Sequence, residues 1–164
     1  TDATLESYDT NFKMMPPLRS DEDRKAIIQG LKDGTIDAIA TDHAPHTDEE
    51  KMAEFPDAPV GVIGVETALS VILTDLYHKK VLSLSEIVLR MSTHPTEIVK
   101  LPNGFGQIKV GTEANLTLVD LNQEWVVKRE DFISKSKNSC FIESKLKGRA
   151  VTTICRGKLW QLSS

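Results

Sequence analysis

The stretch "DGTIDAIATDHAPH" (residues 33–46) decides how the rest of the chain is interpreted. An Asp-Gly pair typical of a helix end opens it, and the apolar run that follows predicts a short buried strand over about residues 35–41. The run stops at Asp42, and two histidines, His43 and His46, come directly after it. Titratable side chains therefore gather where a buried strand leaves the core, which is where α/β folds place their chemistry.

The carboxylate of Asp42 has two physical roles open to it at such a strand end. It can accept hydrogen bonds from nearby backbone amides in a turn. Alternatively, it can bind a metal ion and exchange a proton with a metal-bound water. His46 follows a proline that stiffens the loop, and it could hydrogen-bond an anionic ligand. The aspartate and the two histidines are not expected to complete a zinc site, which needs at least three protein ligands and an open position.

A helix is predicted directly before this stretch. Ser20 and Asp23 have the spacing of a capping box, with an aspartate in place of the usual Glu or Gln. The apolar positions of this helix are Ala26, Ile27, Ile28 and Leu31. A helix, a tight stop and a buried strand in this order are typical of an α/β barrel or sheet.

More helices are predicted after the stretch. Apolar residues at helical spacing predict a helix over about residues 64–79 that packs on a sheet. That apolar face consists of Val65, Leu69, Ile72, Leu73 and Leu76. Ser83 has the position of a cap for the next helix, and His94-Pro95 is expected to begin one more short helix that stops before Pro102.

The pattern changes from helix to strand after Gly104. Glycines and alternating apolar residues replace the helical spacing, and "RAVTTICRGKLWQL" (149–162) predicts two strands with a turn at Arg156-Gly157. We therefore expect two architectural pieces, a helix-rich α/β segment over 1–102 and a segment of mainly strands over 103–164.

Composition excludes several classes of function. The 164 residues, with 40% apolar and 27% charged side chains, are typical of a soluble folded domain or a part of a larger one. A formal net charge of -4 and the lack of a basic stripe argue against nucleic acid as a partner. No run approaches the roughly 18 apolar residues of a membrane helix. Cys140 and Cys155 are too few for a disulfide framework and lack the spacing of a zinc site. Such cysteines are typical of a reducing compartment, so we expect a cytoplasmic protein.

The sequence resembles bacterial dihydroorotases of the amidohydrolase superfamily. The resemblance is carried by "NFKMMPPLRS" (11–20), by the stretch at 33–46, by "APVGVIGVETAL" (58–69) and by "GFGQIKVGTEANLTLVD" (104–120). It implies the C-terminal part of a zinc-dependent (β/α)8 barrel, followed by part of a small β-sandwich. It also implies the reversible cyclisation of N-carbamoyl-L-aspartate to L-dihydroorotate in pyrimidine biosynthesis.

The resemblance also implies roles for individual residues. Asp42 matches the aspartate at the end of the eighth barrel strand, which is a metal ligand and the proton shuttle. His46 matches the histidine that holds the substrate carboxylate, and Val60 and Gly61 match a loop pair whose backbone contacts the pyrimidine ring. The resemblance assigns no role to His43, which we expect to be structural.

Two departures from the family accompany this resemblance. The residue before the paired prolines is usually an asparagine that binds substrate, and here it is Met15, whose thioether cannot replace the amide donor and acceptor. The remaining metal ligands of the family come from earlier strands with no counterpart in the 164 residues, whose histidines are His43, His46, His78 and His94. One or two zinc ions would thus be bound mostly by residues outside this chain, and we expect the segment alone to be inactive.

Alternatives remain at this point. The specificity could be that of another cyclic amidohydrolase, of the hydantoinase or allantoinase type. The segment could also be a non-catalytic, dihydroorotase-like partner of aspartate transcarbamoylase. The expected partners are a small-molecule substrate, the N-terminal segment of the same protein, and either a second copy or a transcarbamoylase.

Overall fold

A computed structural model of the chain describes residues 1–102 and 104–161. The described residues cluster into two compact units whose segments alternate along the sequence. The first unit consists of residues 1–33, 41–68 and 126–145. The second unit consists of residues 34–40 and 69–125 together with the strands from residue 146 onward. The expected division at residue 102 into a barrel segment and a sandwich segment stays a prediction about the complete protein.

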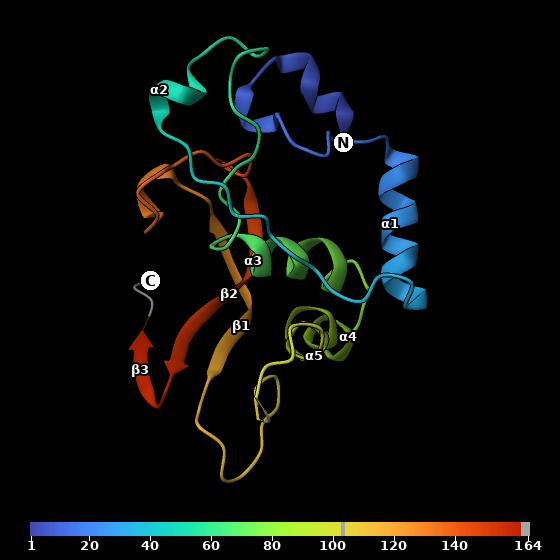
Figure 1. The fold of residues 1–164 in the computed structure, drawn as a ribbon, viewed down its shortest axis with the longest axis vertical. Coiled ribbons are helices and arrows are strands. Elements are labelled where there is room, and N and C mark those ends of the chain that lie inside the picture. Colours follow the sequence, from blue (N-terminus) through green and yellow to red (C-terminus); the bar gives the residue numbers. More distant parts are fainter. Residues whose placement is uncertain (103, 162–164) are drawn as a thin grey trace. The chain divides into compact units, whose positions relative to one another are not determined.

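The first unit is built from short helices joined by loops (Figure 1). Its helices are the 3-10 helices η1 (Asp2–Ser7), η2 (Thr10–Phe12) and η5 (Arg129–Asp131), and the α-helices α1 (Asp21–Asp33) and α2 (Asp48–Lys51). Its buried apolar side chains are Leu31, Ala58, Val62, Ile63, Val127 and Phe132. These residues come from all three sequence segments, so the unit is held together by contacts between distant parts of the chain.

Helix α1 begins as the capping signal predicts. The carboxylate of Asp23 accepts hydrogen bonds from the Ser20 hydroxyl at 2.8 Å and from the Ser20 N–H at 3.2 Å. In return the Ser20 hydroxyl accepts from the Asp23 N–H at 3.1 Å. Of the predicted apolar positions, Leu31 is buried, whereas Ile27 is 57% exposed. The signal for the helix start is therefore confirmed, while much of the predicted stripe faces outward.

The strand predicted over residues 35–41 is not formed. Within the described residues, positions 37–47 have no repetitive secondary structure. A strand is defined by hydrogen bonds to a neighbouring strand, and here the N–H of Ile39 donates instead to the carbonyl of the helical residue Arg90, at 3.0 Å. The apolar run is present, but no strand of the described part of the chain lies beside it to form a ladder.

Two continuous helical stretches belong to the second unit. The first starts as α3 (Ala68–Ile72) and widens into the π-helix η3 (Leu73–Tyr77). The predicted face is buried at Ile72, Leu73 and Leu76, but Val65 precedes the helix and is exposed. In the described part of the chain, no helix combines the length and the apolar character needed to cross a bilayer.

The second stretch is one run rather than the two helices predicted. It passes without a break through α4 (Leu84–Val88), the π-helix η4 (Leu89–Thr93) and α5 (His94–Ile98). Its start is a capping box, as expected, because the carboxylate of Glu86 accepts from the Ser83 N–H at 2.7 Å. Pro95 lies inside this run, directly after the π turn, and it removes one backbone donor there. The proline therefore marks a change of helix type and not a new helix.

The sheet has three strands in the order β1 (Leu116–Val126), β2 (Lys145–Cys155) and β3 (Lys158–Gln161). β2 and β3 pair antiparallel, with Cys155 opposite Lys158. The turn between them has positive φ at both Arg156 and Gly157, as a two-residue hairpin turn requires. The predicted hairpin is thus confirmed over the described residues, and Leu162, the last residue of its predicted second strand, lies outside them.

Gly148 lets the first helical stretch of the second unit, which contains Leu73, lie against β2. A Cβ atom at Gly148 would lie 2.5 Å from Cδ1 of Leu73, which is fully buried. Beside this contact, the hydroxyl of Thr74 accepts a hydrogen bond from the N–H of Lys147 at 2.8 Å. The helix and the sheet are therefore fixed to each other by one close approach and one polar contact.

Candidate functional site

Asp42 stands at a backbone position that few residues adopt. Its φ is 43°, in the left-handed region, where Asp and Asn are tolerated better than most side chains. Asp42 is exposed. The alternative in which its carboxylate caps neighbouring backbone amides is not seen among the described residues, where no hydrogen bond or ion pair is found on that carboxylate. The carboxylate can therefore contact a ligand without first breaking a contact within the described chain.

His43 ties its own loop to the segment that follows Ile63. Its Nδ1 accepts hydrogen bonds from the N–H of Gly64 at 3.2 Å and, at the limit of the range, from that of Val65 at 3.5 Å. A nitrogen that accepts carries no proton, so these contacts place the ring proton on Nε2. This arrangement agrees with the expected structural role of His43.

His46 is held on three sides. Its Nε2 lies 3.0 Å from the carbonyl oxygen of Val60, and its Nδ1 lies 3.6 Å from the carboxylate of Glu50. Its backbone N–H donates to Oδ1 of Asn138 at 3.1 Å. The hydrogen bond from the Thr47 backbone lowers the pKa of Glu50, and the His46 ring contributes in the same direction. His46 and Val60, which the sequence assigned to one site, therefore lie in direct contact.

Gly61 is a position where only glycine fits. Its φ is 97°, and a Cβ atom there would lie 2.7 Å from the Cβ of Ala44. The two loops are also joined by a hydrogen bond from the Ala44 N–H to the Val62 carbonyl at 2.9 Å. Residues 42–46 and 60–64 consequently run against each other with no space for a side chain at Gly61.

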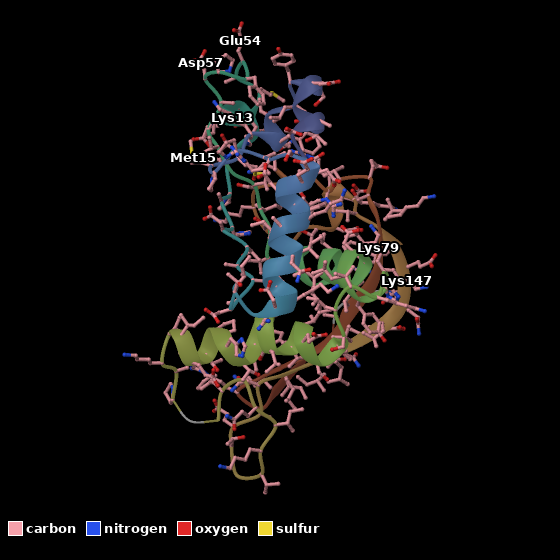
Figure 2. The ribbon with its side chains drawn as sticks, turned by 90° about the vertical axis from the view of Figure 1, so that its right-hand side faces the viewer. Lys13, Met15, Glu54, Asp57, Lys79 and Lys147 are labelled. Atoms are coloured by element: carbon pink, nitrogen blue, oxygen red, sulfur yellow. The ribbon has the colours of Figure 1, made fainter. Side chains whose placement is uncertain are left out.

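Met15 lies close to Gly61 in space, because Lys13, two residues before Met15, is hydrogen-bonded to Gly61. The N–H of Gly61 donates to the carbonyl of Lys13 at 2.8 Å, two residues before Met15. The Met15 side chain is 66% exposed. Figure 2 shows Met15 and Lys13 close to the loop that carries Glu54 and Asp57. The residue at the family's asparagine position therefore lies near the glycine that the resemblance assigns to substrate binding.

Two lysines that the sequence reasoning missed hold this loop. Nζ of Lys13 donates to the carbonyls of Pro56 and Ala58, at 2.8 and 2.6 Å. Nζ of Lys51 donates to the carbonyls of Thr10 and Pro59, both at 2.9 Å. Burial lowers the pKa of Lys51, although the charge of Asp9 opposes that shift. The backbone before Val60 is thus shaped by two ammonium groups that bind carbonyl oxygens.

Asn138 is the other residue that sequence reasoning missed. It is 2% exposed, and its Nδ2 donates to the carbonyl of Ala44 at 3.0 Å and, more weakly, to that of Gly61 at 3.4 Å. Its own carbonyl accepts from the N–H of Ile63 at 2.9 Å. It lies in the polar run "KSKNSC" (135–140), which shows neither periodicity nor a motif that points to a site. No local signal could have found it.

The described residues do not complete a metal site. Asp42 offers one carboxylate, and among the described residues no group of three or more His, Cys, Asp and Glu side chains is arranged to hold an ion. A catalytic zinc ion needs about three protein ligands. Further ligands would have to come from residues other than those described.

An open cavity of about 390 Å³ lies in the first unit, and the buried Asn138 is part of its wall. It is lined by Asp9, Thr10, Asn11, Asp48, Lys51, Met52, Arg129 and Asn138. Asp42, His46, Val60, Gly61 and Met15 are not part of its lining. Asp42 is therefore outside the cavity wall, whereas Asn138, which accepts from the His46 N–H, is part of it.

The sequence matches the Amidohydrolase family over residues 10–160. A dihydroorotase of Endomicrobium trichonymphae is 52% identical over 163 residues, which are 99% of this chain and 38% of that protein. A dihydroorotase of Bacillus subtilis (strain 168) is 47% identical over 158 residues, 96% of this chain and 36% of that protein. The chain thus spans just over a third of the length of these relatives, and the resemblance inferred from the sequence is confirmed.

The fold is also found in a solved structure. The L-hydantoinase (dihydropyrimidinase) from Arthrobacter aurescens matches 100% of this chain and 37% of its own, with a TM-score of 0.93 and 30% identity. Together with the family match, this confirms the prediction of an α/β chain that forms part of an amidohydrolase barrel protein. The absence of a paired strand at residues 35–41 is consistent with a partial barrel.

Proposed function

Because this chain belongs to the amidohydrolase family, we propose that it is part of a dihydroorotase, which interconverts N-carbamoyl-L-aspartate and L-dihydroorotate. The observation that carries this proposal is the 52% identity to a protein named dihydroorotase over 99% of the chain. Identity to the L-hydantoinase over the same chain is 30%. We place the enzyme in pyrimidine biosynthesis and in the cytoplasm.

Asp42 is the proposed acid–base residue. In the hydrolytic direction its carboxylate takes a proton from the attacking water as the new C–O bond forms at the ring carbonyl. It then gives that proton to the amide nitrogen as the C–N bond breaks, so no proton is left over. The exposed side chain and the left-handed backbone of Asp42, at φ 43°, support this role because the carboxylate projects from its loop without a partner among the described residues.

His46, Val60 and Gly61 are the proposed substrate-binding residues. The substrate carries a carboxylate, and the His46 Nε2–H that now meets the Val60 carbonyl would have to turn to the ligand to donate to that carboxylate. The backbone of Val60 and Gly61 would contact the ring amide groups. The 3.0 Å contact of His46 with the Val60 carbonyl supports a single shared site. The positive φ of Gly61 and its close approach to Ala44 hold this backbone in one path, which supports a fixed binding position.

Met15 is proposed to weaken, but not to abolish, substrate binding. In the family the same position carries an amide that binds substrate. A thioether offers only a weak acceptor. The 66% exposure of Met15 leaves it accessible to a ligand that approaches Gly61.

We propose zinc as the cofactor, in one or two ions. Bound zinc supplies a water of lowered pKa and polarises a carbonyl oxygen. This chain would contribute Asp42 as one ligand, and other parts of the protein would contribute the rest. A second copy of the protein or an aspartate transcarbamoylase is a proposed macromolecular partner.

The second candidate function is that of a hydantoinase. It is favoured by the TM-score of 0.93 with the L-hydantoinase and by the loss of the amide at Met15. Both enzymes open a cyclic amide, so the roles of Asp42 and of the metal would be unchanged. The two functions differ in whether the substrate carries a carboxylate for His46 to bind.

The test is a substrate comparison with the longest encoded protein that contains this chain, purified and loaded with zinc. Its kcat/KM is measured for L-dihydroorotate, for 5-substituted hydantoins and for allantoin. We expect kcat/KM for dihydroorotate to exceed that for the other substrates by at least about a hundredfold. A substrate without the carboxylate leaves polar groups of the site without a partner, and each such group costs about 1–3 kcal/mol. A preference for a hydantoin would replace the proposal, and no turnover of any substrate would favour the non-catalytic partner.

A further inference from the structure

Asn138 brings together two loops that are separate in the sequence. Its side chain accepts from the His46 N–H at 3.1 Å and donates to the carbonyls of Ala44 and Gly61, at 3.0 and 3.4 Å. Its backbone carbonyl accepts from the Ile63 N–H at 2.9 Å. One buried residue therefore contacts the loop at 44–46 on one side and the loop at 61–63 on the other.

The chemistry of these contacts requires an amide. A primary amide carries an acceptor and two donors on one planar group. In Asn138 the oxygen meets an N–H and the nitrogen meets two carbonyl oxygens, so each end has a partner of the right kind. An aspartate of the same shape would turn an oxygen toward the two carbonyls, and an alanine would leave all three partners without a contact. Asn138 is 2% exposed although it lines the open cavity, so a water that replaced the amide would have to enter from the cavity side.

We propose that Asn138 is a positioning residue that sets the distance between the His46 ring and the Val60–Gly61 backbone. The inference rests on the proposed function, because it is through these residues that substrate would be bound. His46 contacts the Val60 carbonyl at 3.0 Å, so a shift of either loop changes the gap in which a substrate carboxylate and ring amide would lie. Asn138 makes no contact with the Asp42 side chain among the described residues, so its effect falls on binding and not on proton transfer.

The experiment uses the complete, zinc-loaded protein and three variants. Asn138→Asp keeps the acceptor and removes both donors, whereas Asn138→Ala removes the whole amide. Ser139→Ala is the matched control, because Ser139 is also 2% exposed and, among the described residues, its hydroxyl accepts from the nearby Phe141 N–H at 3.2 Å and from neither loop. The readouts are kcat, KM for dihydroorotate, and the hydrogen exchange of peptides that cover residues 43–48 and 60–65.

We expect both Asn138 variants to raise KM by about tenfold or more while kcat stays within about threefold of the wild type, since small displacements of binding groups cost about this much. Exchange of the His46 amide should accelerate in Asn138→Ala and less in Asn138→Asp, which keeps the acceptor. Ser139→Ala should change neither KM nor exchange in these peptides. An unchanged KM in folded Asn138→Ala protein would overturn the proposal, as would a fall in kcat alone.

Hydrogen exchange separates this inference from the proposed function. If the wild type does not turn over dihydroorotate, the function is wrong, but faster exchange of both peptides in Asn138→Ala still supports the role of Asn138 in joining the loops. If the wild type is active and exchange at both loops is unaffected by Asn138→Ala, the positioning role is wrong and the function stands.

Discussion

The side chain of Asn138 accepts a hydrogen bond from the backbone N–H of His46 at 3.1 Å, across a sequence separation of 92 residues. His46 in turn contacts the carbonyl of Val60 at 3.0 Å. The candidate substrate-binding residues are therefore organised by a segment that the sequence motif does not include. This relationship makes the geometry of the site dependent on contacts that can be tested one at a time.

Met15→Asn should restore a donor and an acceptor at the position where the family has an amide. If that amide binds substrate, KM for dihydroorotate should fall by about 5- to 150-fold, the equivalent of about 1–3 kcal/mol. Steady-state kinetics of the complete protein measure this change. Met52→Asn is the control, since Met52 is 82% exposed and outside the candidate set. An equal KM in wild type and Met15→Asn would remove position 15 from the binding site.

Gly61→Ala should destabilise the complete protein more than Gly157→Ala. Both glycines have positive φ, at 97° and 73°, so each alanine carries the strain of the left-handed region, about 1–2 kcal/mol. Only at Gly61 does the new Cβ meet another atom, the Ala44 Cβ at 2.7 Å, whereas Gly157 has open space. Overpacking of this kind adds about 1–3 kcal/mol. Denaturant unfolding measures the difference, and equal losses in the two variants would show that the loops are not in contact.

Lys13→Met should loosen the loop before Val60. The variant keeps the apolar stem but loses the hydrogen bonds to the carbonyls of Pro56 and Ala58 and the contact of the ammonium with the Phe55 ring, 5.7 Å from its centroid. We expect hydrogen exchange in residues 54–60 to accelerate by about tenfold or more. Tenfold is the equivalent of about 1.4 kcal/mol, close to the lower end of the range for one hydrogen bond to a charged group.

Lys79→Met is the control for this experiment. Lys79 belongs to the second unit, where it forms an ion pair with Asp75. Its loss should leave exchange in residues 54–60 unchanged. If Lys13→Met and Lys79→Met have equal hydrogen exchange in residues 54–60, Lys13 does not hold this loop.

The two cysteines should differ in reactivity toward alkylating reagents. Burial raises the pKa of the Cys140 thiol from 9.0 to about 11, whereas Cys155 is exposed. Because the thiolate is the reactive form, a shift of two units lowers its fraction at pH 8 by about a hundredfold relative to the unfolded chain. Mass spectrometry after brief treatment with iodoacetamide should find Cys155 modified first, and denaturant should make the rates similar. Equally fast modification of Cys140 in the folded protein would contradict the raised pKa of its thiol.

Local signals in the sequence predicted local structure well. The predicted capping pair Ser20–Asp23 is formed, and Ser83 caps its helix as predicted, with Glu86 three positions on as its partner. The turn at Arg156-Gly157 is fixed by the conformational freedom of two neighbouring residues, and it too was predictable. Such contacts depend on little beyond the quoted sequence, which is why sequence reasoning finds them.

Structure that depends on distant partners was not predictable in the same way. The run at 35–41 has the composition of a strand, but it pairs with none among the described residues, and Ile39 bonds to a helix carbonyl instead. Within the site, the resemblance proposed His46, Val60 and Gly61 together, and the structure brings them into one neighbourhood. Asn138, Lys13 and Lys51 could not be found, because a polar residue in a loop carries no periodic signal of what it binds.

The central claim is that Asp42 moves the proton in an amidohydrolase reaction, and Asp42→Asn tests it most directly. Asparagine tolerates the left-handed φ of 43° and keeps the size of the side chain, so the loop should be preserved. Asp37→Asn serves as the control, because Asp37 is an exposed carboxylate just upstream. Both variants are made in the complete protein and loaded with zinc.

The measurement is kcat for dihydroorotate, together with KM and the zinc content of each variant. We predict that Asp42→Asn lowers kcat by about a thousandfold, within the range for loss of a general acid–base group, while KM stays within about threefold and most of the zinc remains bound. Asp37→Asn should match the wild type. Turnover of zinc-loaded Asp42→Asn close to that of the wild type would contradict the account.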